Sequence, residues 1–442
     1  MKALPDEELA EVGGAVAEGQ GAALHDVSAG PSQLEQLLAR GRLRSTLWML
    51  GPAFVASIAY VDPGNFATNI RGGAQFGYLL LWVVLVANLM AMLVQYLSAK
   101  LGIVTDQSLP EVCRERFPRF VTWGLWVQAE LMAMATDIAE FLGAAIALNL
   151  LFGVPLFAAG LMTCVIAFAI LGLQTHGFRR FELAITALLG IILAGFLYET
   201  LRIGPSVHGS LRGLLPSLHG STSLYLAVGI MGATVMPHVI YLHSALTKNR
   251  VRLRNDRERS RVLRFERLDV IIALSLAGLV NMAMLAVAAK LFHTPALDGL
   301  RTFQAAYHHI STQVSGFAAL AFAVALLASG ASSSGVGTYA GQVVMAGFID
   351  VNIPLVVRRA VTMIPALIVL GVGLNATSVL ILSQVVLSFG IPLALVPLVM
   401  LTGDREVMGI HVNRALTARV AWLVAGLITA LNLVLIFQTF GG

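Results

Sequence analysis

Long apolar segments separated by short polar loops run along most of the chain. A helix needs about 20 mainly apolar residues to cross a bilayer, and eleven segments after the first 44 residues satisfy this requirement. They are residues 46–76, 78–101, 120–150, 154–174, 180–202, 222–247, 268–293, 312–348, 358–374, 377–402 and 419–440. The pattern predicts an all-α membrane protein with eleven transmembrane helices.

The predicted spans form two groups of five and a last one alone. We expect a cytoplasmic tail at 1–44, a first repeat at 45–203 and an external connection at 204–221. A second repeat then covers 222–403, and an internal loop with the eleventh span covers 404–442. The tail lacks the basic start, apolar core and cleavage site of a signal peptide. An odd number of spans in each repeat would make the two repeats inverted in the membrane.

The composition agrees with a membrane setting. Hydrophobic residues make up 57% of the chain and charged residues only 12%, with a mean hydropathy of +0.81, whereas soluble domains carry about 25% charged residues. The two cysteines are too few for a disulfide framework or a cysteine-based zinc site. The net charge of +5 is spread over many short loops, which argues against nucleic-acid binding.

The loops differ strongly in their content of Lys and Arg, which are retained on the cytoplasmic side of a membrane. One alternate set of loops, together with the tail, holds 24 of these residues, and the other set holds four. The asymmetry predicts an integral protein of the cell membrane with its N-terminus inside and its C-terminus outside.

Two predicted spans contain a helix breaker near their centre. In the first span Asp62 precedes Pro63 and Gly64, and in the sixth span Met236 precedes Pro237. Proline removes a backbone donor and disfavours helix at the residue before it. Discontinuous helices at matching positions of two halves indicate a secondary transporter whose substrate binds at the breaks. The other interpretation is that both prolines are ordinary membrane-helix kinks.

The side chains around the breaks suit a cation. Asp62 offers a carboxylate, Asn65 an amide oxygen, Met236 a thioether and His238 an imidazole, and broken helices free backbone carbonyls. Ca²⁺ and Mg²⁺ prefer oxygen alone, so a thioether favours softer ions such as Mn²⁺, Fe²⁺, Co²⁺ or Cd²⁺. Met236 is then a selectivity device, although methionine also commonly fills gaps in a core.

A path for protons is indicated by acids in the third span. Glu130, Asp137 and Glu140 are spaced by seven and three residues, so they share one helical face. Acids at this depth normally mark an ion path, and burial disfavours the charged form of Asp62, which could carry a proton until a metal displaces it. His238 could tune or relay that proton. The other interpretation is a structural network that clamps the span to Arg or His partners.

Other polar residues receive weaker assignments. Gln384 in the tenth span is an additional candidate for a ligand or gate, although an interhelical hydrogen bond is the commoner role of such a residue. His176 and His243 are expected to be ordinary polar residues near span ends. The Gly and Ser residues between Ser329 and Gly341 favour close helix packing, and they could also ease bending during alternating access. No nucleotide-binding glycine loop is found.

The sequences Asp62-Pro63-Gly64-Asn65 and Met236-Pro237-His238 resemble the paired signature of the Nramp (natural resistance-associated macrophage protein) divalent-metal transporters, and the likeness extends over all eleven predicted spans. The resemblance is to the bacterial proton-coupled manganese transporters of that family. It implies a LeuT-like fold of five plus five inverted helices and one extra, with the first and sixth discontinuous, and uptake of Mn²⁺ and Fe²⁺ with protons. It places the metal ligands at Asp62, Asn65 and Met236, with carbonyls of Ala59 and Ala233.

The same resemblance implies that the third-span acids lead toward arginines of the ninth span, here Arg358 and Arg359. The expected cargo is a metal ion and the expected partners are protons and lipid, with no cofactor, no enzyme activity and no obligatory protein partner. Two other functions fit parts of the pattern. One is Na⁺-coupled amino-acid symport on the same fold, which the anionic Asp62 disfavours, and the other is a cation channel, for which no repeated filter is found.

Overall fold

The computed structural model describes Leu34, Ala39 and residues 51–175, 178–248, 250–251, 253–294, 302–351 and 353–440. Apart from Leu34 and Ala39, the predicted tail at 1–44 lies outside the described residues, as do the first residues of the first predicted span and His176. The described part is built from helices and contains no strand, which confirms the all-α prediction there.

The helices follow the predicted order. They are α4 (Pro52–Ile58), α5 (Pro63–Phe76), α6 (Leu81–Thr105), α7 (Leu109–Arg116), α8 (Arg119–Phe152), α9 (Leu156–Thr175), α10 (Phe178–Ile203), α11 (Val207–Arg212), α12 (Gly220–Thr234), α13 (Pro237–Thr247), α14 (Asp256–Phe292), α15 (Phe303–Gln313), α16 (Gly316–Ile349), α17 (Leu355–Val372), α18 (Ala376–Gly403), α19 (Arg405–Met408) and α20 (Ala415–Phe440). Short 3-10 turns lie at Ala59–Val61, Gly77–Leu80 and Gly409–His411.

Among the described residues, eight helical segments are long and apolar enough to cross a membrane. The count is lower than eleven partly because α5 and α6 follow each other through a 3-10 turn and form one segment, Pro63–Thr105. The stretch Leu156–Ile170 is apolar but shorter. The presence of several apolar spans is therefore established, while the number eleven, the boundaries of the repeats and the orientation of the termini stay predictions.

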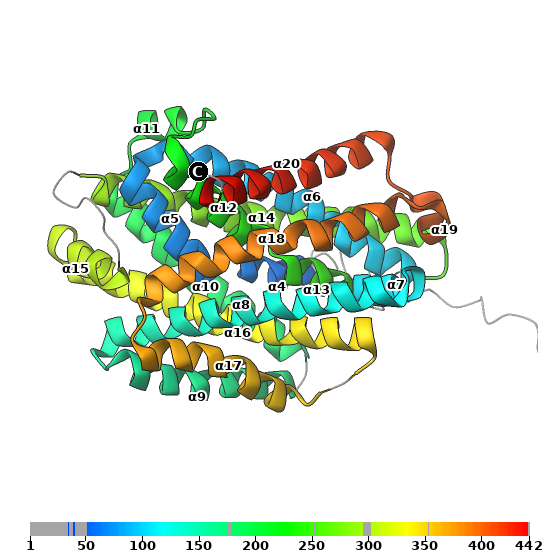
Figure 1. Ribbon diagram of the computed structural model, residues 1–442, viewed down its shortest axis with the longest axis horizontal. Coiled ribbons are helices and arrows are strands. Elements are labelled where there is room, and N and C mark those ends of the chain that lie inside the picture. Colours follow the sequence, from blue (N-terminus) through cyan, green and yellow to red (C-terminus); the bar gives the residue numbers. More distant parts are fainter. Residues whose placement is uncertain are drawn as a thin grey trace, which may run out of the picture.

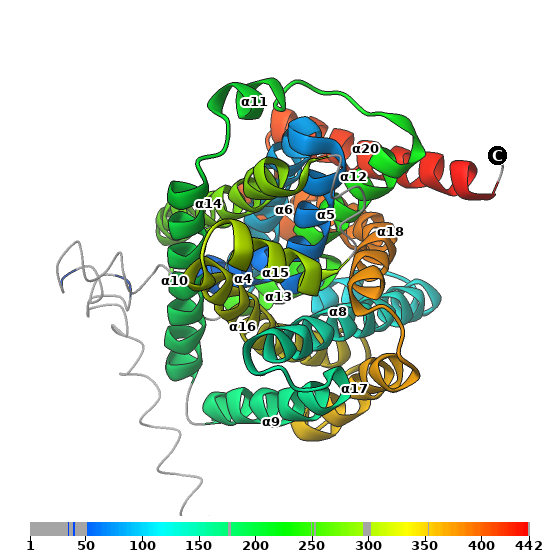
Figure 2. The same cartoon turned by 90° about the vertical axis from the view of Figure 1, so that its left-hand side faces the viewer.

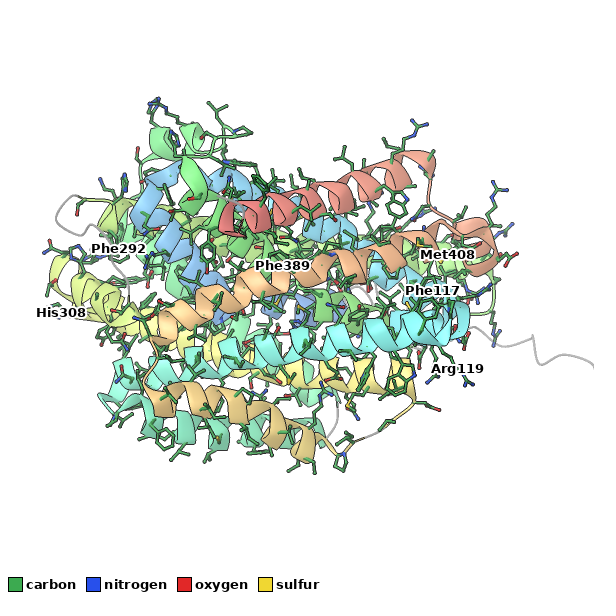
Figure 3. All side chains as sticks on the ribbon, in the orientation of Figure 1. Phe117, Arg119, Phe292, His308, Phe389 and Met408 are labelled. Atoms are coloured by element: carbon green, nitrogen blue, oxygen red, sulfur yellow. The ribbon has the colours of Figure 1, made fainter. Side chains whose placement is uncertain are left out.

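The long helices run side by side along the longest axis of the molecule (Figure 1). Helices α9 and α17 form an outer layer at the lower edge in both views, and α4 lies inside the bundle (Figures 1 and 2). Phe292 and His308 lie at one end of the bundle, and Phe117, Arg119 and Met408 lie at the other (Figure 3). The breaks are thus enclosed by helices from both predicted repeats.

Helix α16 packs closely on α8 through small residues, as expected for the Gly and Ser cluster. A Cβ atom on Gly330 would lie 2.9 Å from the backbone nitrogen of Ala144 in α8. Small residues let two membrane helices approach until their backbones touch. This contact gives the third span a fixed position beside the breaks.

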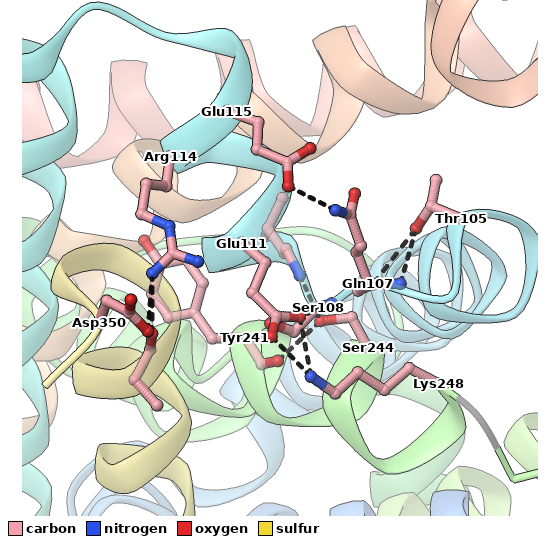
Figure 4. Close-up of polar contacts among 12 residues, drawn as sticks. Thr105, Gln107, Ser108, Glu111, Arg114, Glu115, Tyr241, Ser244, Lys248 and Asp350 are labelled. Atoms are coloured by element: carbon pink, nitrogen blue, oxygen red, sulfur yellow. Dashed lines mark hydrogen bonds and ion pairs between the residues drawn. The ribbon is translucent and has the colours of Figure 1, made fainter. Parts of the chain in front are cut away.

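Helix α7 joins α13 to α16 at one end of the bundle (Figure 4). Ser108 and Glu111 form a capping box at the start of α7, and Glu111 also receives two hydrogen bonds from Lys248 Nζ, at 2.7 and 2.8 Å. Arg114 of the same helix pairs with Asp350 at 3.4 Å. Burial raises the pKa of Glu111, but the bonds from Lys248 and Ser108 outweigh it and hold this pKa below its ordinary value.

The Glu111 contacts make a testable contribution to stability. A carboxyl whose pKa is lowered by folding stabilises the protein above its unfolded-state pKa, about 4.3, and this stabilisation is lost as the pH falls through the folded-state pKa. We expect Glu111→Gln to lower the melting temperature at pH 7, by an amount that shrinks below about pH 4. Glu115→Gln is the control, because Glu115 lies in the same helix and accepts a hydrogen bond from Gln107 in an exposed contact. An equal difference at both pH values would contradict this account.

Candidate functional site

The backbone is interrupted at Asp62. Helix α4 ends at Ile58, a 3-10 turn covers Ala59–Val61, and Asp62 is extended, with φ −78° and ψ 168°, before α5 begins at Pro63. Proline is well placed at the first position of a helix because it lacks the N–H that would otherwise have no partner there. The Asp62 carboxylate caps α5 by accepting a hydrogen bond from Asn65 N at 2.8 Å.

A second interruption lies between α12 and α13. Helix α12 ends at Thr234, Val235 and Met236 are not helical, and α13 begins at Pro237. Met236 and Ala233 are both fully buried, as is Ala59 at the first interruption. The same chemistry therefore operates twice: a proline starts a new helix and the residue before it is extended.

Asn65 connects the two interruptions directly. Its Nδ2 donates hydrogen bonds to Asp62 Oδ1 at 2.7 Å and to the carbonyl oxygen of Ala233 at 2.9 Å. The Thr234 hydroxyl donates to Asn65 Oδ1 at 3.4 Å. Three residues that were predicted as ligands, Asp62, Asn65 and Ala233, are thus brought together by segments 168 residues apart.

Several polar atoms around this contact have no hydrogen-bond partner among the described residues. They are Asp62 Oδ2, His238 Nε2 and Gln384 Oε1. Asp62 and Gln384 are fully shielded from solvent and His238 is 1% exposed, and buried polar groups are normally paired. The Gln384 side chain lies against Gly64, where an added Cβ would overlap it. An unsatisfied carboxylate oxygen enclosed in this way points to a ligand that the site is built to hold.

Backbone carbonyls freed at the first interruption are partly held by other helices. Tyr60 O accepts a hydrogen bond from Asn281 Nδ2 of α14, and Val61 O accepts one from Ser329 Oγ of α16, each at 2.6 Å. Asn281 and Ser329 are buried. These polar groups satisfy backbone that could not stay unpaired at this depth, and they fix the position of the interruption.

Helix α8 touches the first interruption. A Cβ on Gly143 would overlap the ring of Pro63. Glu140 lies one turn before Gly143 on the same face of α8, and Asp137 lies a further turn away. The predicted row of acids therefore starts beside the residue that follows Asp62.

The three acids of α8 differ in their partners. Arg358 makes a two-point contact with Glu130 at 3.1 and 2.7 Å, and Arg359 pairs with Asp137 at 2.6 Å while also bonding Ser334. Glu140 is buried, and its Oε2 has no hydrogen-bond partner in the described part of the chain. The structural clamp considered from the sequence thus exists for Glu130 and Asp137, while Glu140 stands apart.

Two histidines take different positions. His238 Nδ1 lies 3.2 Å from the Thr136 hydroxyl of α8, so its ring lies between α13 and the third span. His243, expected to be an ordinary polar residue near a span end, is fully buried and contacts Gln95 at 2.9 Å and Glu266 at 3.0 Å. His243 does lie near the end of α13, as expected, but its burial and its contacts were not foreseen, because the hydropathy pattern does not show which helix face a polar residue occupies.

The groups that could bind a metal at the interruptions are of several chemical kinds and are not all acidic. Within the described residues no three His, Cys, Asp or Glu side chains gather in a group that could hold a metal ion. The residues at the two interruptions instead carry one carboxylate, one amide and one thioether, beside backbone oxygens. This combination suits a borderline transition metal that must also be released.

Several residues that make contacts near the site were not identified from the sequence. Ser329 and Ser334 were treated as small residues of a packing cluster, and Thr136 received no role. The sequence does not distinguish them because Ser and Thr are common in membrane helices, where their hydroxyls often bond the carbonyl four residues earlier in the same helix. The structure is needed to show which of these hydroxyls bond a residue of another helix.

The chain matches known proteins over most of its length. The family model described as natural resistance-associated macrophage protein-like (Nramp) matches residues 53–438. A "Divalent metal cation transporter MntH" of Deinococcus radiodurans is 52% identical over 90% of this chain and 92% of the relative. Its counterpart of the same name in Bacillus subtilis is 50% identical over 90% and 93%.

The chain is also similar in fold to solved structures of transporters. A mutant of the Eremococcus coleocola manganese transporter has a TM-score of 0.82 and 36% identity, covering 90% of this chain and 89% of that one. A nucleobase-cation-symport-1 family transporter has a TM-score of 0.59 at 14% identity, over 88% and 91% of the two chains. The second likeness concerns the fold alone, and both are neighbours of the LeuT-like kind.

The buried ion pair between Asp137 and Arg359 generates a stability prediction. Arg359→Met leaves the Asp137 carboxylate buried without its partner, and we expect it to lower the free energy of unfolding by about 3–5 kcal/mol. The double variant Asp137→Leu/Arg359→Met removes both charges and should recover most of this loss. Thermal unfolding of the purified protein in detergent measures both effects. A double variant as unstable as the single one would show that the pairing is not what matters.

Proposed function

This chain belongs to the Nramp family, and from that premise we propose that it is a secondary active transporter that imports divalent transition metal ions, Mn²⁺ and Fe²⁺, together with protons by alternating access. The observation that carries the proposal is Asp62 Oδ2, which has no hydrogen-bond partner in the described part of the chain and is enclosed where two interrupted helices meet. The names of the relatives, divalent metal cation transporter and manganese transporter, support the same class of cargo.

We assign the metal ligands to Asp62, Asn65 and Met236, with carbonyl oxygens of Ala59 and Ala233. In the described state the Asn65 Nδ2 group lies between Asp62 Oδ1 and Ala233 O and donates to both. A cation in that position would meet the same two oxygens. If the Asn65 amide turned over, its Oδ1 would take the place of the Nδ2 group. The metal would then have several oxygen ligands and the Met236 sulfur as its one soft ligand.

The third span supplies the proposed proton path. Metal binding requires Asp62 to be ionised, so a bound proton must leave when the ion arrives. Glu140 is the suitable acceptor, because Asp137 and Glu130 are already paired with Arg359 and Arg358. We assign to His238 the relay of the proton between α13 and α8, a role supported by its contact with Thr136 of α8. Ion pairs further along α8 then give a charged route away from the metal.

The proposed topology makes import favourable without a nucleotide. With eleven spans, inverted repeats of five and an N-terminus inside, the two breaks lie near the middle of the membrane. A divalent ion gains about 4.6 kcal/mol when it crosses 100 mV toward the negative side, and a proton adds about half of that. Gln384, against Gly64, is positioned as an additional ligand or gate.

Reconstituted protein in proteoliposomes tests the proposal. We expect saturable Mn²⁺ uptake with acidification of the lumen, because the metal displaces protons that leave on the same side, and no uptake of amino acids. Asp62→Ala should abolish uptake and binding, since it removes the only carboxylate assigned to the metal. Val61→Ala is the matched control, because it shortens a buried neighbour of Asp62 and leaves in place the carbonyl that accepts the hydrogen bond from Ser329. Mn²⁺ binding at wild-type affinity by Asp62→Ala would refute the assignment.

The sulfur of Met236 should determine selectivity. We expect Met236→Ala to weaken discrimination against Ca²⁺ more than it weakens Mn²⁺ transport, because the softer ion alone gains from a thioether. Competition of Ca²⁺ with Mn²⁺ uptake measures the ratio. Met231→Ala is a suitable control, because Met231 is a buried methionine within α12, outside the interruption. Undiminished exclusion of Ca²⁺ by the Met236 variant would remove this role from the sulfur.

A further inference from the structure

Helix α14 carries buried polar side chains that contact the first half-helix, which we define as α4 with its 3-10 turn, Pro52–Val61. Asp269 and Asn281 contact it directly, one at each end, and Glu266 is linked to it through other side chains. None of these three residues belongs to the predicted metal ligands or to the proposed proton path.

The start of the half-helix is held by Asp269. Its Oδ2 accepts hydrogen bonds from Gly51 N at 3.1 Å and from Ala53 N at 3.0 Å, and the residue is fully buried. The residue that precedes α4 is Gly51, which offers no capping side chain. The first N–H groups of a helix need acceptors, and here a carboxylate from a different helix provides them.

The far end of the half-helix is held through Tyr60. Asn281 Nδ2 donates to its carbonyl oxygen at 2.6 Å, and Gln95 Nε2 donates to its hydroxyl at 2.5 Å. Gln95 in turn contacts His243, and His243 contacts Glu266. Both ends of the half-helix are therefore connected to α14, at one end through a chain of buried side chains.

The half-helix is short and packs among other helices, with six of the seven residues of α4 buried. The side-chain hydrogen bond from Ser57 Oγ to Phe54 O lies within α4 and does not connect it to a neighbour. Gly51 lies before it and the interruption at Asp62 lies after it. A short helix between two flexible points can turn as a unit once its end contacts are lost.

We propose that Asp269 is a positioning residue that keeps the first half-helix closed against α14, and that these two hydrogen bonds must break for the path on that side of the metal site to open. Hydrogen bonds from two N–H groups to one carboxylate stabilise the closed position of the half-helix strongly. Both bonds break together when the half-helix turns. Asp269 Oδ1 has no hydrogen-bond partner among the described residues, so this carboxylate serves the half-helix through Oδ2 alone. The inference rests on the alternating access proposed above.

The test measures opening directly and without metal. In a background with Cys113→Ser and Cys164→Ser, which removes both native cysteines, Ala56→Cys places a thiol in the half-helix at a position that is 1% exposed. We expect Asp269→Ala to raise its rate of maleimide labelling roughly tenfold, as the loss of hydrogen bonds to a charged group implies. Asp269→Asn retains one acceptor oxygen and should give an intermediate rate.

Two controls distinguish opening from general loosening. Asp404→Asn alters a carboxylate that caps Glu406 N at 2.8 Å far from the half-helix, and it should leave the labelling rate unchanged. A thiol at Ala425→Cys, buried in α20, should react equally slowly with and without Asp269.

An unchanged rate at position 56 in folded, monodisperse Asp269→Ala would overturn the proposal, and so would an equal rise at position 425. If Asp269→Ala does not fold, the labelling rates of the thiols at positions 56 and 425 are measured in Asp269→Asn, and the same outcomes apply. Because no metal is present, the result is independent of the Mn²⁺ uptake that tests the proposed function.

Discussion

A charged group and broken backbone cannot lie inside a membrane protein without partners, and the rest of this structure follows from that constraint. Asp62 and the residues beside it are fully buried, where each unpaired polar group costs several kcal/mol. Asn65, Asn281 and Ser329 supply hydrogen bonds from three helices. The interruption is therefore maintained by contacts from both predicted repeats, and one carboxylate oxygen is left for a ligand.

The surrounding helices are held in two different ways. Helices α8 and α16 touch at the backbone through Gly330, and α8 is tied to α17 by two ion pairs. The first half-helix is buried among other helices, and its polar contacts to α14 lie at its ends. In the proposed mechanism, loss of those polar contacts lets the half-helix turn as a unit. The proposed metal site lies at the boundary between these two parts.

The sequence was sufficient to locate the interruptions, because proline acts through local backbone chemistry that needs no knowledge of the fold. Pro63 and Pro237 begin new helices, as predicted. The pairing of acids and arginines was not predictable to the same degree. That Arg358 contacts Glu130 while Arg359 contacts Asp137 depends on the register between α8 and α17. Asp269 escaped notice because it lies at the predicted start of the seventh span, residues 268–293, where an acid normally faces solvent, whereas α14 begins earlier, at Asp256. The number of spans was also hard to derive, since consecutive helices such as α5 and α6 are joined by a 3-10 turn.

The hydrogen bonds of Asn65 have a kinetic consequence. Its amide already bridges Asp62 and Ala233, so an ion binding at the proposed site would exchange one set of favourable contacts for another. The net gain on binding would then be smaller than either set of contacts taken alone. In the proposed transporter, such near-balance would shorten the residence time of the ion and let the carrier cycle quickly while it still recognises its cargo.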